Sequence, residues 1–228
     1  MRKITAGPIM VFLGLLILAL VPGVGIVNLL FNRLPLGDFR GIVLFFASIF
    51  LVYAFAILLY RIFLHYMPIK EGYIEEGSPE EFNYHVYVLF YLILFYPLIR
   101  NYFIPTPLMR ILYLALGTKL GSNTYSAGVI LDPPLTEAGT NTIIGHDAVL
   151  FSHAIESRRL SHARIKIGNN VTIGAKSIIM AGVTIEDGAI VAAGAVVKKS
   201  THIGPGELWG GNPAKRLRTQ QKFDTSSI

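Results

Sequence analysis

Residues 167–203 read IGNNVTIGAKSIIMAGVTIEDGAIVAAGAVVKKSTHI, and an aliphatic residue returns at every sixth position of this stretch. The members of this series are Ile167, Ile173, Ile179, Ile185, Val191, Val197 and Ile203. The residue four places after each is small or β-branched: Val171, Ser177, Val183, Ala189, Ala195 and Thr201. A six-residue period is not that of a helix or an ordinary strand, but it fits a solenoid whose coils have three short faces. We therefore expect the aliphatic residues to stack inside the coils and the small residues to lie at the corners.

Glycine recurs near the predicted corners, where a positive φ is cheap only for this residue. The glycines expected to serve the corners in this way are Gly168, Gly174, Gly182, Gly188, Gly194 and Gly204. Other residues, Met180, Glu186 and Lys198, replace glycine after the aliphatic position, which loosens the repeat without breaking it.

The repeat is interrupted on its N-terminal side. Leu150 and Ile167 are 17 residues apart, and the stretch between them, SHAIESRRLSHARIK at 152–166, is polar and charged. We expect this stretch to be a loop ejected from one corner of the solenoid. Irregular first coils are expected upstream, interrupted by Asp132-Pro133-Pro134, because terminal repeats must cap an open end.

The N-terminal part has the composition of membrane helices. Pro8–Phe31 and Gly41–Tyr60 are each long enough to span the hydrocarbon core, while Val86–Ile99 is shorter and contains Pro97. The number of true spans, two or three, stays open at this stage. We expect residues 1–104 to form the membrane anchor and residues 105–119 an interfacial linker helix. No small-x-small cleavage site follows the first segment, so we expect it to be retained rather than removed as a signal peptide.

The charge and cysteine content exclude several classes. The chain has 20 basic and 14 acidic side chains, a net charge of +6, without a block of like charge typical of nucleic-acid arms. It has no cysteine, which excludes disulfides, a thiol nucleophile and thiolate zinc sites. Residues 215–228 are expected to form a basic C-terminal tail, either solvated or in contact with phosphate groups.

The hexapeptides IGNNVT, IGAKSI, IMAGVT, IEDGAI and VAAGAV, closed by WGGNPAK at 209–215, resemble those of the hexapeptide-repeat acyltransferases. The resemblance covers residues 121–215. It implies a left-handed parallel β-helix over residues 120–214, an exception to the right-handed crossover rule. It also implies homotrimers, with acyl-CoA lying between neighbouring solenoids and a histidine on or beside the ejected loop acting as the base.

Acyl transfer from a thioester needs a base near neutral pH and a donor for the oxyanion, which a backbone N–H can supply. His153 is the preferred base, because it stands where the last coil breaks into the polar loop. Glu156, three residues later, is expected to orient its imidazole. His162 and His146 are secondary candidates. Direct transfer needs no covalent enzyme intermediate, which agrees with the absence of cysteine.

The co-substrate is expected to be acetyl-CoA or another acyl-CoA, with no metal. Small residues would leave flat backbone for the pantetheine arm, the G-N-P motif would match the family's terminal motif, and basic residues would meet the CoA phosphates. The expected set is Gly174, Ala175, Ala193, Gly194, Lys198, Asn212, Pro213, Lys215 and Arg216.

A membrane anchor favours an acceptor at the membrane surface, such as a lipid-linked sugar, an envelope polysaccharide or another envelope component. Because CoA is cytosolic, the solenoid is expected on the cytosolic side of the inner (cytoplasmic) membrane, although the distribution of Lys and Arg does not decide the orientation. Two alternatives remain open. One is a zinc enzyme similar to the γ-class carbonic anhydrases, which bind zinc through three histidines across a subunit interface; the candidate histidines of this chain are His146, His153 and His162. The other is a non-catalytic assembly scaffold.

Overall fold

The computed structural model describes residues 2–31, 33–101, 103–157 and 159–219. The chain forms two compact units. The helical unit contains residues 2–69 and 77–92, and the solenoid unit contains residues 70–76 and the chain from residue 93 onward. The solenoid unit thus includes residues 70–76 and residues 93–104, which lie within the range expected for the membrane anchor.

Three helices build the helical unit: α1 (Ala6–Phe31), α2 (Arg40–Tyr66, preceded by the short turn η1, Gly37–Phe39) and α3 (Pro79–Phe90). Helices α1 and α2 approach closely at Gly23, where an added Cβ would lie 2.6 Å from Cγ2 of Val52. The rings of Phe12 and Phe90 meet edge to face at 5.2 Å between α1 and α3. The hydroxyl of Ser78 caps α3 by accepting a hydrogen bond from the Glu81 backbone N–H.

Helix α3 continues through a π-helical turn, η2 (Tyr91–Phe95), into the short α4 (Tyr96–Arg100). Pro97 lies in the first turn of α4 and has no N–H to donate, and the widened turn precedes it. Three helical stretches, Ala6–Phe31, Gly37–Tyr66 and Pro79–Arg100, are long and apolar enough to cross a membrane. The predicted apolar helices are therefore present, and each is longer than its apolar stretch in the sequence.

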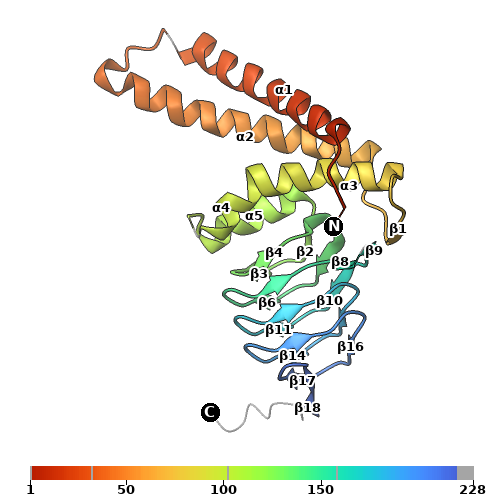
Figure 1. The fold of residues 1–228 in the computed structure, drawn as a ribbon. Helices are drawn as coiled ribbons and strands as arrows, with labels where there is room; N and C mark the ends of the chain where they lie inside the picture. Colours follow the sequence, from red (N-terminus) through yellow and green to blue (C-terminus); the bar gives the residue numbers. More distant parts are fainter. Residues whose placement is uncertain (1, 32, 102, 158, 220–228) are drawn as a thin grey trace, which may run out of the picture. The chain divides into compact units, whose positions relative to one another are not determined.

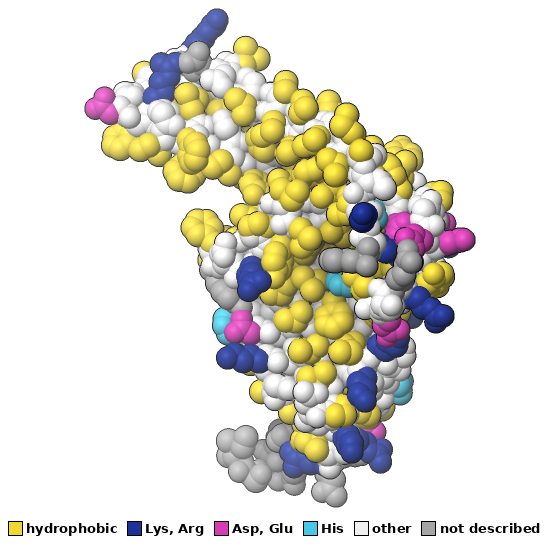
Figure 2. All heavy atoms as spheres, in the orientation of Figure 1, with side chains coloured by type: hydrophobic (Ala, Val, Ile, Leu, Met, Phe, Trp, Pro, Cys, Tyr) yellow, Lys and Arg dark blue, Asp and Glu magenta, His cyan; other side chains and the backbone are white. Residues whose placement is uncertain are grey.

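The outer surface of α1 and α2 is apolar. Large side chains such as Met10, Val21, Leu29 and Phe50 are each more than 60% exposed. Figure 2 shows such side chains covering the visible face of these helices, with charged groups near the connection between them. A surface of this kind is unfavourable in water and favourable in lipid.

The predicted solenoid is present. Its coils contribute strands to three parallel sheets, in the orders β16-β13-β10-β5-β2 (sheet B), β17-β14-β11-β6-β3 (sheet C) and β15-β12-β7-β4 (sheet D). Figure 1 shows the strands of sheet C stacked one below another. The strands are β2 (Lys119–Leu120), β3 (Tyr125–Ser126), β4 (Val129–Ile130), β5 (Thr136–Ala138), β6 (Ile143–Ile144), β7 (Val149–Leu150), β10 (Ile165–Ile167), β11 (Thr172–Ile173), β12 (Ile178–Ile179), β13 (Thr184–Ile185), β14 (Ile190–Val191), β15 (Val196–Val197), β16 (His202–Ile203) and β17 (Glu207–Gly210).

The six-residue series forms the core, as predicted. All seven aliphatic residues are buried, and the register pairs each with a residue 18 places away, as in Ile167 with Ile185 and Ile173 with Val191. A coil therefore uses three hexapeptides, one for each sheet. Five of the six small residues of the second series are buried beside them, and Thr201 is half-buried.

The glycine prediction is correct for only half of the set. Positive φ occurs three residues after each aliphatic position, at Gly182, Gly188 and Gly194, and also at non-glycine residues such as Asn170 and Lys176. The other glycines directly follow the aliphatic residue, and positive φ is not what selects them. At Gly168 and Gly174 an added Cβ would collide with the backbone of the next coil, and at Gly204 it would approach the Glu207 carboxylate. Gly168 and Gly174 therefore require glycine for close packing rather than for φ, whereas at Gly204 a Cβ would only crowd a side chain.

The ejected loop is a β-hairpin. Strands β8 (His153–Glu156) and β9 (Arg159–His162) pair antiparallel, and a third strand, β1 (Gly72–Ile74), pairs with β9. The chain takes 17 residues from Leu150 to Ile167, where a regular hexapeptide takes six. The hairpin thus leaves the solenoid at the corner between sheets D and B.

Both ends of the solenoid are covered. Helix α5 (Thr106–Leu116) matches the predicted linker helix and packs on the first coils, where the buried Tyr113 hydroxyl donates to the Gly128 carbonyl and accepts from the Ile130 N–H. At the other end, β18 (Lys215–Thr219) pairs antiparallel with β17. The predicted basic tail therefore begins as a strand of the solenoid, because backbone pairing fixes it, and residues 220–228 lie outside the described residues.

Candidate active site

The base of the hairpin brings a histidine against a buried carboxylate. The Nδ1 atom of His153 lies 2.7 Å from Oδ2 of Asp132. The same oxygen accepts hydrogen bonds from the backbone N–H groups of Ser152, at 2.7 Å, and of His153, at 3.1 Å. The Asp132 side chain is only 2% exposed, while that of His153 is 26% exposed. The pair is thus anchored on the inside and accessible through the imidazole.

The turn after β4 holds Asp132 in place. The short helix η3 (Pro133–Leu135) begins directly after it, and the Asp132 carbonyl accepts from the Leu135 N–H and the Thr136 hydroxyl. The Ser152 hydroxyl donates to the Leu135 carbonyl at 3.0 Å and joins the two segments. The carboxylate position is therefore set by backbone contacts on both sides.

The environment suits His153 to proton transfer. Burial disfavours the charged imidazole, but the hydrogen bond and negative charge of Asp132 outweigh burial, so the pKa of His153 is raised above its usual value. A carboxylate only accepts hydrogen bonds, so Nδ1 carries the hydrogen toward Asp132. In the neutral ring Nε2 is then the atom that takes up a proton, as in a carboxylate-oriented general base.

Glu156 does not orient His153, contrary to the sequence-based expectation. Residues three apart on a strand point to opposite faces, and both residues lie on β8. The carboxylate of Glu156 forms an ion pair with Lys199 instead. Asp132 takes the predicted role of Glu156, although in the sequence Asp132-Pro133-Pro134 looks only like an interruption of the first coils.

His162 lies directly opposite His153 in the register of the hairpin. It is buried, and its Nδ1 donates to the carbonyl of Lys70 at 3.2 Å. Burial lowers the pKa of His162 below its usual value. The structure thus places this secondary candidate beside the preferred base but away from solvent, while its catalytic role stays a prediction.

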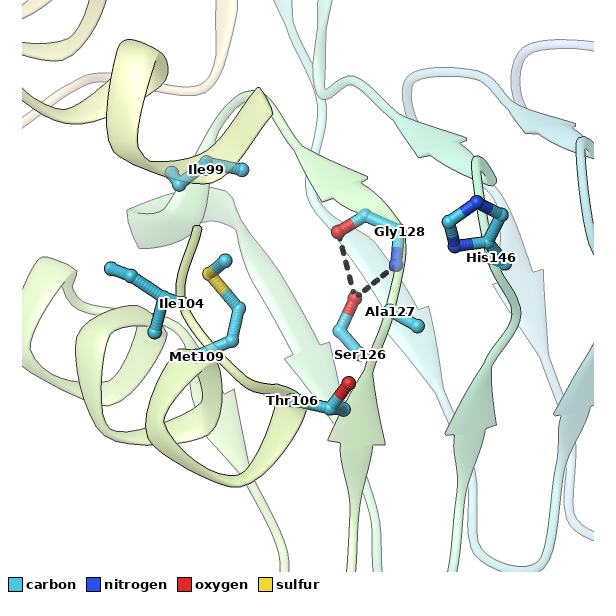
Figure 3. A pocket seen from close by; sticks show the side chains of 8 residues that line it. All are labelled: Ile99, Ile104, Thr106, Met109, Ser126, Ala127, Gly128 and His146. Carbon is cyan, nitrogen blue, oxygen red and sulfur yellow. Dashed lines mark hydrogen bonds between the residues drawn. The ribbon is translucent and has the colours of Figure 1, made fainter. Parts of the chain in front are cut away.

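The other secondary candidate, His146, lies at a different corner. It follows β6, between sheets C and D, and lines a small pocket of about 60 Å³ together with Ile99 of α4 and Met109 of α5. Figure 3 shows His146 on the strand side of this pocket and Ile99, Ile104 and Met109 on the helix side. A pocket of this volume holds a few carbon atoms rather than a nucleotide.

Most of the expected cofactor residues are brought together. Gly174 and Ala175, and one coil later Ala193 and Gly194, lie at the corner between sheets C and D, where the Gly194 N–H donates to the Ala175 carbonyl at 2.8 Å. The chain after β17 continues this column of small residues with Gly211, Asn212 and Pro213. We call this corner the small-residue column. His146 lies at the same corner one coil before Gly174, and its carbonyl accepts a hydrogen bond from the Lys176 N–H.

The expected basic residues lie elsewhere. Lys198 follows β15 at the corner between sheets D and B, the corner from which the hairpin leaves. Lys215 and Arg216 belong to β18, and the Arg216 guanidinium binds the Glu207 carboxylate at 2.9 Å. The structure therefore divides the predicted set between two corners and the end strand.

Within the described ranges, no group of three or more His, Asp and Glu side chains is placed to hold a metal ion in one protomer. His153 and His162 are neighbours, but His146 is at another corner. A zinc site made by these three histidines would therefore have to lie between subunits, as the alternative supposes.

Comparison with known proteins agrees with this architecture. Residues 164–199 match the family model "Bacterial transferase hexapeptide (six repeats)". The acetyltransferase-like protein YvoF of Bacillus subtilis is 34% identical over 109 residues, which cover 46% of this chain and 62% of YvoF. Mitochondrial gamma carbonic anhydrase 2 of Arabidopsis thaliana is 37% identical over 83 residues, which cover 36% of this chain and 26% of that protein.

Among solved structures, the hexapeptide-repeat-containing acetyltransferase VCA0836 of Vibrio cholerae, complexed with acetyl coenzyme A, is similar with a TM-score of 0.42. The identity is 30%, and the match covers 46% of this chain and 61% of that one. This chain thus matches less than two thirds of the length of these relatives.

Proposed function

We propose that the chain is a membrane-anchored acyltransferase that moves an acyl group, most simply acetyl, from acyl-CoA to a hydroxyl or amine of an envelope acceptor. The observation that carries the proposal is the His153–Asp132 pair at the base of a hairpin inserted in a hexapeptide solenoid. The sequence similarity to acetyltransferases, YvoF among them, supports it. The family match over residues 164–199 supports the same reading of the repeat.

In the proposed reaction, Nε2 of His153 takes the proton of the acceptor hydroxyl or amine as its oxygen or nitrogen attacks the thioester carbonyl. The tetrahedral intermediate then expels the CoA thiolate, which receives the proton back from His153 and leaves as the thiol. Asp132 keeps the hydrogen on Nδ1 and stabilises the imidazolium during the transfer. No covalent bond to the enzyme forms in this scheme.

The surface of the solenoid supports the proposal of a homotrimer, while the left-handed coil is proposed from the resemblance of the repeats. Outward residues of sheet B are mainly charged, including Lys119, Glu137 and Lys166. Those of sheets C and D are mainly apolar: Tyr125, Ile143, Thr172, Ile190 and Leu208 on C, and Val129, Val149, Ile178 and Val196 on D. In the proposed trimer the apolar faces are covered by neighbouring copies, and acyl-CoA lies along the small-residue column.

The exposed apolar surface of α1 and α2 supports membrane anchoring. An anchored enzyme gains most from an acceptor confined to the same surface, so a lipid-linked sugar, an envelope polysaccharide or another envelope component is the proposed acceptor class. Because acyl-CoA is cytosolic, the solenoid is placed on the cytosolic side of the cytoplasmic membrane. A tag after Ile228 should then be protected from protease in intact cells, and digestion from outside would overturn this orientation.

The decisive experiment measures thermal stabilisation of the detergent-purified chain by acetyl-CoA, longer acyl-CoAs and CoA. A ligand at a hundred times its Kd adds about 2.7 kcal/mol to the stability of the folded state. We expect stabilisation by acetyl-CoA, and release of free thiol when a membrane extract supplies the acceptor. Failure of every acyl-CoA to bind would overturn the proposal.

A zinc enzyme is the second candidate, favoured by the similarity to the plant gamma carbonic anhydrase and by the presence of His146, His153 and His162. Such a site would need histidines from two copies of the chain. Stoichiometric zinc in the purified protein, lost together with CO₂ hydration in histidine variants, would favour it over acyl transfer.

A further inference from the structure

The candidate site includes a strand that comes from the connection between α2 and α3. Strand β1 pairs with β9, which places Gly72 opposite His162 and Ile74 opposite Leu160. Both Ile74 and Leu160 are buried, at 1% and 2% exposure. In the sheet order β1-β9-β8, strand β9 is the central strand and depends on β1 for half of its backbone partners. The hairpin is therefore a three-stranded sheet completed from outside the solenoid repeats.

Lys70 and Glu71, which we call the β1 lead-in, directly precede β1, and Lys70 contacts one of the two histidines of the hairpin. The Lys70 carbonyl accepts a hydrogen bond from Nδ1 of His162, which fixes the orientation of that ring. His162 lies opposite His153 across the β8–β9 pairing. A shift of β1 would thus move the residue that stands beside the proposed base.

Arg164 locks this arrangement. Its backbone N–H and its Nε both donate to the Glu71 carboxylate, each at 3.0 Å. Its Nη1 donates to the Pro134 carbonyl at 3.1 Å and to the Glu137 carboxylate at 2.9 Å. Pro134 is part of η3, the turn that begins directly after Asp132. One guanidinium, with its side chain 23% exposed, therefore joins the β1 lead-in, the end of the hairpin and the turn that carries Asp132.

We infer that Arg164 is a positioning residue for the His153–Asp132 pair, and that the connection between α2 and α3 is, through Glu71 and β1, a working part of the acyl-transfer site. The inference rests on the proposed function. Planar guanidinium groups hold several acceptors in a fixed geometry, which a flexible ammonium group does not reproduce. The segment that joins two membrane helices would then control how the base is presented to the acceptor.

The test uses the full chain in detergent with the variants Arg164→Gln, Arg164→Lys and Glu71→Gln. Lys119→Gln is the matched control, because the Lys119 ammonium also binds the Glu137 carboxylate, at 2.7 Å, but is 74% exposed and bonds neither Glu71 nor Pro134. Two quantities are measured: hydrogen exchange of the peptides covering residues 153–162 without substrate, and kcat and KM for acetyl-CoA-dependent transfer.

We expect faster exchange of the hairpin in Arg164→Gln and Glu71→Gln, together with a fall in kcat of roughly tenfold to a hundredfold at an unchanged KM for acetyl-CoA, as for a misplaced catalytic group. Arg164→Lys should recover part of the loss, and Lys119→Gln should resemble the parent in both measurements. Unchanged hairpin exchange would show that the contacts of Arg164 and Glu71 do not hold the hairpin in place, and faster exchange with unchanged kcat would overturn the positioning role. If the hairpin of the parent protein is protected from hydrogen exchange but the parent transfers no acetyl group, the proposed function is overturned, and the positioning role with it.

Discussion

Asp132 and His153 meet because they occupy nearly equivalent places in successive coils. Sheet D pairs Ile130 of β4 with Leu150 of β7, and because the two strands are parallel, the segments that follow them leave the sheet in the same direction. Asp132 follows Ile130 by two residues, and His153 follows Leu150 by three, so stacking brings the carboxylate to 2.7 Å from the imidazole. The solenoid repeat itself, rather than the local sequence of the hairpin, thus supplies the partner of the proposed base.

Replacing Asp132 by Asn should lower kcat by roughly tenfold to a hundredfold, because the amide no longer fixes the hydrogen on Nδ1 or stabilises the imidazolium. The pKa of His153 is raised by Asp132 against the effect of burial. Since the base acts when neutral, activity should rise with pH through that raised pKa. Loss of the carboxylate should therefore move the acidic limb of the kcat/KM profile to lower pH.

The control for Asp132→Asn is Glu156→Gln, which removes the ion pair with Lys199 at an exposed site. It should leave both the rate and the pH profile close to those of the parent. A large loss in Glu156→Gln with a normal Asp132→Asn enzyme would restore the assignment made from sequence spacing.

Replacing His153 by Ala should slow the chemical step by about a hundredfold to ten-thousandfold, which is the usual contribution of a positioned base. Folding and acetyl-CoA binding should be nearly intact, because the imidazole lies outside the stacked core. Single-turnover kinetics and acetyl-CoA binding measure the two effects separately. If His153→Ala keeps normal turnover while His146→Ala or His162→Ala abolishes it, the base is misassigned. A loss in all three together with bound zinc would support the metal enzyme.

The solenoid could be predicted because its core is periodic in sequence. Every sixth residue is aliphatic because it stacks on its equivalent in the next coil, as Ile173 does on Val191. The apolar helices were also visible from composition alone. The glycines of the repeat were grouped as one class, although Gly174 directly follows its aliphatic residue and serves close packing, while Gly194 comes three residues after its own and has a positive φ.

The partner of His153 was missed because its signal is not local. Asp132 precedes two prolines and reads as an ordinary turn residue, and its role depends on the alignment of β4 with β7, which the irregular first coils hide. The available signal was the 20-residue step from Ile130 to Leu150, which places Asp132 beside Ser152 once the coil register is known. Strand β1 had no signal at all, because its pairing with β9 joins segments far apart in sequence.

Replacing Tyr113 by Phe should destabilise the solenoid unit by about 1 kcal/mol, because it removes the two buried hydrogen bonds that the hydroxyl makes with the Gly128 carbonyl and the Ile130 N–H. Burial raises the pKa of the Tyr113 hydroxyl, so the neutral form bridges both groups at all ordinary pH values. Denaturant unfolding should show the loss. Tyr125→Phe, at an exposed tyrosine of β3, serves as the control. Equal stability of the two variants would contradict a bridging role for the hydroxyl.

Replacing Gly23 by Leu should separate α1 from α2. Ala19, Gly23 and Val27 form a buried stripe on α1, and even a Cβ at Gly23 would lie 2.6 Å from Cγ2 and 2.9 Å from the backbone N of Val52. Overpacking of this kind costs about 1–3 kcal/mol. Gly25→Leu is a matched control on the same helix, because a Cβ there meets nothing within 4 Å, and both variants share the gain in helix propensity. We expect a lower thermal midpoint for Gly23→Leu than for Gly25→Leu in detergent. The midpoint is measured from the loss of the helical circular dichroism signal on heating. Identical midpoints would show that the close approach of α1 and α2 at Gly23 contributes nothing to the stability of the helical unit.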